Sequence, residues 1–98
     1  METRDLSTEE IVAITRAALK SVLPRTKIDK IVIGGGDFGF DPGIKITVVV
    51  SAGSSVNLKG EQLTKIVQIV SGEMFKKGDN RFPYLRYLTA QEMKQLAS

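Results

Sequence analysis

Two aspartates in a glycine-rich stretch come nearest, among the residues of this chain, to a spacing that could do chemistry. Asp37 and Asp41 flank Phe38-Gly39-Phe40 and follow three consecutive glycines. Carboxylates and loop carbonyls are the ligands that Ca²⁺ and Mg²⁺ take, and two carboxylates can also act as general acid and base. Two carboxylates are a poor ligand set, and an exposed hairpin tip offers no cleft that would hold one of them protonated. We therefore expect no metal, no cofactor and no catalytic residue in this stretch.

The same stretch satisfies the dinucleotide-binding pattern G-x-G-x-x-G. Gly34, Gly36 and Gly39 follow a strand-like segment, as that pattern requires. In a dinucleotide site a helix then begins and holds the pyrophosphate at its N-terminus. Here the chain runs through Pro42 and Gly43 into a second strand-like segment. The pattern therefore predicts a flexible ten-residue hairpin loop over residues 34–43, and no nucleotide site.

The amino-acid composition argues against most catalytic mechanisms. The 98 residues include no histidine and no cysteine, so the chain lacks the side chain that most readily carries protons near neutrality and the thiolate nucleophile. A catalytic site needs a nucleophile, a base and an orienting group together, and no such set assembles in the sequence. A small enzyme relying on carboxylates or backbone groups is therefore the weakest of three hypotheses.

Cations and aromatic side chains alternate near the C-terminus, where residues 81–87 read Arg-Phe-Pro-Tyr-Leu-Arg-Tyr. On single-stranded nucleic acid such a run supplies phosphate contacts and stacking platforms. On a strand, one face would hold Phe82, Tyr84, Arg86 and Leu88. The simpler interpretation is an edge strand with its tyrosines at the core margin and its arginines in solvent.

The net charge of +3 is mild for a nucleic-acid-binding domain. Residues 1–10 sum to −3, so the remaining residues sum to +6 without a long basic run. We therefore expect nucleic acid to be an unlikely partner. A weak nucleic-acid-binding domain is the alternative hypothesis. It would use Lys45, Arg81 and Arg86 together with the aromatic residues near them.

Three helices are expected around these residues. Ser7 and Glu10 form a capping-box pattern before a helix over Thr8–Leu23. A second helix over Gly60–Lys77 has apolar residues at helical spacing, and a third over Ala90–Ala97 follows a second capping-box pattern. The second helix is expected to bury Leu63, Ile66, Val67, Val70 and Met74.

Three strands complete the expected fold. Lys27–Ile33 has apolar residues on both faces, which favours a central strand, whereas Ile44–Ser51 alternates apolar and polar residues. Phe82–Leu88 contains Pro83 near its start, as edge strands do. The order α-β-β-α-β-α predicts a single α+β domain over residues 1–98, a two-layer sandwich of a three-stranded sheet with helices on one face.

The first four expected elements resemble a KH nucleic-acid-binding domain in their order alone. The KH clamp is a GXXG turn between two helices, and the glycines of residues 34–39 lie between strands instead. The resemblance therefore implies no function for this chain.

The leading hypothesis is a non-catalytic binding module that self-associates, first of all as a dimer. A chain this short has a thin core, and the two phenylalanines at positions 38 and 40 must bury against something. The partner is a second copy, another protein or a small molecule, with no membrane and a cytoplasmic location expected from the acidic N-terminus. The candidate interface comprises Phe38, Phe40, Val49, Tyr84 and Arg86.

Overall fold

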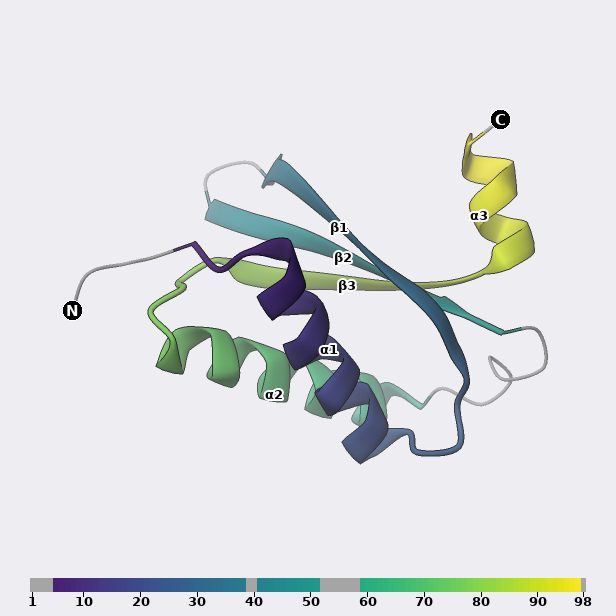
Figure 1. The fold of residues 1–98 in the computed structure, drawn as a ribbon, viewed down its shortest axis with the longest axis horizontal. Coiled ribbons are helices and arrows are strands. Elements are labelled where there is room, and N and C mark those ends of the chain that lie inside the picture. The colour runs from purple at the N-terminus through teal and green to yellow at the C-terminus, as the bar shows by residue number, and fades with distance from the viewer. Residues whose placement is uncertain (1–4, 39–40, 52–58, 98) are drawn as a thin grey trace.

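The computed structural model describes residues 5–38, 41–51 and 59–97. Its elements follow the expected order α-β-β-α-β-α, so the predicted α+β class is confirmed (Figure 1). They are α1 (Thr8–Val22), β1 (Ile28–Phe38), β2 (Asp41–Val50), α2 (Gly60–Lys76), β3 (Phe82–Thr89) and α3 (Ala90–Ala97). No helix in these three ranges is long and apolar enough to cross a membrane.

The sheet has the order β1-β2-β3 and is mixed. β1 pairs antiparallel with β2, and β2 pairs parallel with β3 through the crossover helix α2. β2 is therefore the central strand, and the prediction of a central position for the first strand is wrong. A register shift between Ile28 and Lys30 explains the misleading pattern, because this bulge lets Ile28 join Ile31 and Ile33 against the core.

The predicted ten-residue loop is also wrong, since both strands extend into it. Gly34, Gly35 and Gly36 pair with Lys45, Ile44 and Gly43, and the pairing continues to Phe38 opposite Asp41. Glycine weakens a strand without forbidding one, and here pairing with a well-patterned central strand outweighs the local preference for a turn. Phe40, a candidate interface residue, lies outside the described residues.

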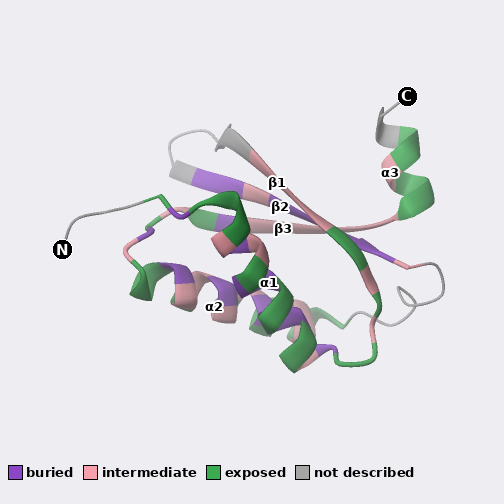
Figure 2. Cartoon of the chain, viewed as in Figure 1, coloured by how far each residue is buried: buried purple, intermediate pink, exposed green. Residues whose placement is uncertain are grey.

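The helices α1 and α2 cover one face of the sheet, and their sheet-facing sides are buried (Figure 2). The predicted capping box is present: the Glu10 amide donates to the Ser7 hydroxyl oxygen at 3.2 Å, and the Ser7 amide donates to the Glu10 carboxylate at 3.3 Å. It fixes the start of α1, so that Ile11, Ala18 and Leu19 face the core.

Three of the five apolar residues expected to face the sheet from α2 are buried completely. These are Ile66, Val70 and Met74, whereas Leu63 and Val67 are only half-buried. The smaller helix α3 begins where β3 ends and stands at that end of the sheet, where it contacts β3 and β2 (Figure 1). On the rest of the sheet face turned away from α1 and α2, the described part of the chain places no helix (Figure 1).

Candidate functional site

The sheet face turned away from α1 and α2 brings together most of the site residues expected from the sequence, and we call it the outer face. It is defined by strand alternation, since Ile44, Ile46, Val48 and Val50 face the helices and their neighbours point the other way. Between Gly43 and Val49 of β2 the cross-strand register gives this face twelve positions: Lys30, Val32, Gly34, Gly36, Gly43, Lys45, Thr47, Val49, Phe82, Tyr84, Arg86 and Leu88. They include three cations and no carboxylate, and the same alternation continues to Asp41 at the hairpin end of β2.

An aromatic pair occupies the start of β3 on the outer face. The rings of Phe82 and Tyr84 lie 4.9 Å apart at an interplanar angle of 58°. Phe82 lies opposite Gly43, which has no side chain to cover it, and is 46% exposed. Tyr84 lies opposite Lys45, so an aromatic ring and a cation occupy neighbouring positions on β3 and β2. This end of the outer face therefore offers π-surface beside positive charge.

Arg86 lies across the middle of the outer face. Its Nη2 donates to Thr47 Oγ1 at 3.4 Å, a long hydrogen bond, and Thr47 itself is buried. The Nε of Arg86 is buried and has no hydrogen-bond partner among the described residues. A guanidinium with unused donor capacity is a favourable binder of planar anions once its side chain reorients.

Val49, another interface candidate, contributes little to this surface. It is only 1% exposed, at the end of the sheet where α3 contacts β2 and β3. The backbone of Phe38 lies in β1 opposite Asp41, and Asp37 lies opposite Pro42 in the same hairpin. Of the three candidate interface residues whose side chains the structure describes, Tyr84 and Arg86 are the two that are half-buried on the outer face.

Arg81, expected from the sequence to contact nucleic acid, is held elsewhere. Its Nη2 lies 2.7 Å from Asp79 Oδ2 and donates to the Leu6 carbonyl at 3.2 Å. The Leu6 amide in turn donates to Asp79 Oδ2 at 3.0 Å. These bonds tie the segment before α1 to the turn before β3, so the group has a structural role.

The electrostatics of Asp79 fit that role. Burial raises the pKa of the Asp79 carboxyl, but the hydrogen bonds from the Arg81 side chain and from the Leu6 and Arg81 backbone amides outweigh it and hold this pKa below its ordinary value. Sequence reasoning missed this group. An available signal was an aspartate two residues before Arg81 in a turn, because such a side chain commonly accepts from the backbone amide two residues on.

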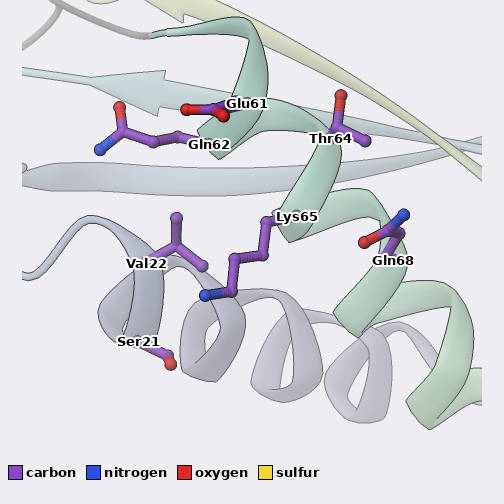
Figure 3. Close-up of a pocket in the computed structure, with 7 residues that line it drawn as sticks. All are labelled: Ser21, Val22, Glu61, Gln62, Thr64, Lys65 and Gln68. Carbon is purple, nitrogen blue, oxygen red and sulfur yellow. The ribbon is translucent and has the colours of Figure 1, made fainter.

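Hollows also lie beside the helices, and one of them borders the outer face at Arg86. A cleft of about 790 Å³ between the end of α1 and the start of α2 has a mixed polar lining, into which Lys65 reaches from α2 toward Ser21 and Val22 (Figure 3). Glu61 and Lys65 oppose each other in charge there, so the cleft favours neither anions nor cations. A hollow of about 390 Å³ between α2 and β3 is lined by Leu63, Thr64, Val67, Leu85, Arg86 and Tyr87.

Tyr87 lines the hollow between α2 and β3, and the pKa of its hydroxyl is strongly shifted. Burial raises the pKa of its hydroxyl to about 12, and the hydroxyl has no hydrogen-bond partner among the described residues. It is therefore un-ionised at neutral pH and has no base beside it, as a tyrosine nucleophile would need. In the described ranges, no three histidine, cysteine, aspartate or glutamate residues gather to hold a metal ion.

Comparison with known proteins returns no match to a protein-family model, a curated protein or a solved structure.

Proposed function

We propose that this chain is a non-catalytic binding module that engages an anionic partner through the outer face. The observation that carries the proposal is the composition of that face: three cations and two neighbouring aromatic rings at twelve described positions, with one acidic residue, Asp41, at the hairpin end of β2. Interfaces rely on complementary charge to select partners, and a face with an excess of cations selects anions. Two observations support a role in binding rather than catalysis. The sequence contains no histidine and no cysteine, and the Asp79 carboxylate is engaged in hydrogen bonds within the fold.

The same charges disfavour a dimer formed by two outer faces. A two-fold axis would set the same patch against itself, so that Lys30, Lys45 and Arg86 would meet the same cations of the second copy. Like charges brought together without compensation cost several kcal/mol in an interface. If the chain self-associates, it does so through another surface.

Retention on heparin, a sulfated polyanion, tests the proposal. The double variant Lys30→Ser/Lys45→Ser removes two cations from the outer face. Lys20→Ser/Lys65→Ser is the matched control, because it removes two exposed lysines from α1 and α2 and gives the same net charge. We expect the first variant to elute at clearly lower salt than the control, since local charge density governs such binding. Equal elution of the two variants would refute the proposal.

A second candidate function, self-association, is supported by the edge of β1. This strand is 11 residues long and pairs on one side only, with β2, among the described residues. Its bulge and two of its three charged residues, Asp29 and Lys30, lie near one end, and Asp37 lies near the other. The stretch from Ile31 to Gly36 between them contains no proline and no charge. Such an edge is a template for pairing with another chain. We propose antiparallel pairing of two β1 strands, which makes one six-stranded sheet with both outer faces on the same side.

Sedimentation equilibrium tests self-association. Val32→Lys places a charge near the middle of β1, where an antiparallel pairing would bring two such lysines together. We expect the parent to dimerise at about 100 μM and this variant to be monomeric, since micromolar association is measurable there. Gly72→Lys adds the same charge on α2, in a position with nothing within 4 Å, and should leave the parent behaviour unchanged. A monomeric parent would exclude this second function and leave the first untouched.

A further inference from the structure

We infer that the anionic partner of the outer face is single-stranded nucleic acid, an inference that rests on the proposed binding function. Cations alone would serve an acidic peptide, a sulfated polymer or a nucleic acid equally well. The outer face adds Phe82 and Tyr84, whose rings lie 4.9 Å apart at its more open end. Base stacking on aromatic rings is what distinguishes the recognition of single strands from general attraction to anions.

The arrangement of the cations fits a strand lying along β3. Phe82, Tyr84 and Arg86 follow one another at every second residue, which spaces them by roughly 6.6 Å along the strand. Lys45 lies beside Tyr84 on β2, and Arg86 has an Nε without a partner among the described residues. Bases can therefore lie on the two rings while the phosphates face Lys45 and Arg86. The stretch from Phe82 to Leu88 spans about 20 Å, enough for a few nucleotides.

The arrangement also excludes a duplex as the preferred ligand. In a duplex the bases are stacked on one another, so they are not free to lie on a protein ring. At Phe82 and Tyr84 the sheet offers no helix for a major groove, because α1 and α2 lie on its other face and α3 stands at the opposite end of β3 (Figure 1). Binding should therefore be selective for single strands, tolerant of sequence and strongly dependent on salt.

Fluorescence anisotropy with labelled oligo-dT of roughly 12 nucleotides, a length within the site sizes of single-strand binders, tests the inference. A duplex of the same length and a poly-glutamate peptide are the competing probes. We expect the parent to bind oligo-dT at least about tenfold more tightly than either of them. Phe82→Leu/Tyr84→Leu keeps apolar bulk but removes both rings, and should weaken oligo-dT binding at least about tenfold, since stacking of one base corresponds to a factor of roughly 5 to 150.

Two controls make the result specific. Phe75→Leu changes an exposed phenylalanine on α2, which is 68% exposed, and should leave oligo-dT binding unchanged. Gly34→Glu places a carboxylate opposite Lys45 in a position with nothing within 4 Å, and should weaken binding, whereas Gly72→Glu on α2 should not. If the aromatic variant does not fold, the glycine pair still tests the site.

The outcomes separate the inference from the function on which it rests. Heparin retention that depends on Lys30 and Lys45, with no preference for oligo-dT over duplex and poly-glutamate, would overturn the inference and leave the proposed function intact. Unchanged oligo-dT binding after removal of both rings would do the same. Loss of the heparin difference between the two lysine variants would instead remove the proposed function itself.

Discussion

The two faces of the sheet are built from alternate residues of the same strands, and they have different tasks. On β2, Ile46, Val48 and Val50 face α1 and α2 and are almost completely buried. On the opposite face the same strand presents Lys45 and Thr47 beside Tyr84 and Arg86 of β3. If the outer face binds a partner as proposed, residues for stability and residues for recognition are separated by a single residue step along one strand. Substitutions on the helix side should therefore change unfolding, and those on the outer face should change binding.

Two arginines flanking these faces show the same division at the level of single side chains. Arg81 is surrounded by acceptors, with both Asp79 oxygens and the Leu6 carbonyl within hydrogen-bond distance. Arg86 has one long hydrogen bond to Thr47 and an Nε without a partner among the described residues. The hydrogen bonds of Arg81 stabilise the fold, whereas Arg86 has donor capacity that the described residues do not use.

The largest effect on stability is expected from Asp79→Ala. Asp79 is 1% exposed, and its removal leaves the Leu6 amide and the half-buried Arg81 guanidinium without their shared acceptor. Removing one partner from this hydrogen-bonded group should lower the free energy of unfolding by about 3 kcal/mol, as measured by urea denaturation. Asp29→Ala is the matched control, since Asp29 is exposed and also accepts one side-chain hydrogen bond, from Ser51. It should change stability by less than about 0.5 kcal/mol. Comparable losses in the two variants would contradict the structural role of Asp79.

The pH dependence of unfolding gives a second measure of the same group. The pKa of the Asp79 carboxyl is lower in the folded chain than the ordinary value of 3.8. Its contribution is therefore complete above the unfolded pKa and is lost as the pH falls through the folded pKa. We expect the stability difference between the parent and Asp79→Asn to shrink as the pH is lowered from about 6 to about 2, as both then contain a neutral side chain at this position. A difference that stays constant over that range would show that charge plays no part.

The elements and their order could be predicted because local signals and the final fold agree. The capping patterns at Ser7 and at Thr89 and the helical spacing of Ile66, Val70 and Met74 all match the observed helices. The position of β1 and the paired glycines could not be predicted, because they depend on cross-strand pairing, which outweighs the local turn preference of residues 34–36, Pro42 and Gly43.

The candidate site was predictable only in part, for the same reason. Strand alternation alone placed Tyr84 and Arg86 on one face of β3 and Lys45 on one face of β2. The parallel register of β2 and β3 places Lys45 on the same side of the sheet as Tyr84 and Arg86, and the sequence does not specify this register. The pairing of Arg81 with Asp79 is local, but the hydrogen bonds of both residues to Leu6 join positions more than 70 residues apart, and this long-range contact has no local trace in the sequence.

The smallest predicted effect compares two valines on α2. Val70 is fully buried in the core, whereas Val67 is half-buried and lines the hollow between α2 and β3. Val70→Ala should cost about 2 kcal/mol of unfolding free energy, because the lost methyl groups leave a cavity that the packed layer cannot close. Val67→Ala should cost about half as much, since water already reaches that side chain and can fill the space. Urea unfolding of both variants measures the difference, and oligo-dT binding by the folded variants should match the parent, as neither valine lies on the outer face. Equal costs would place Val67 in the core after all, and a loss of binding in either variant would show that the helix layer also shapes the binding surface.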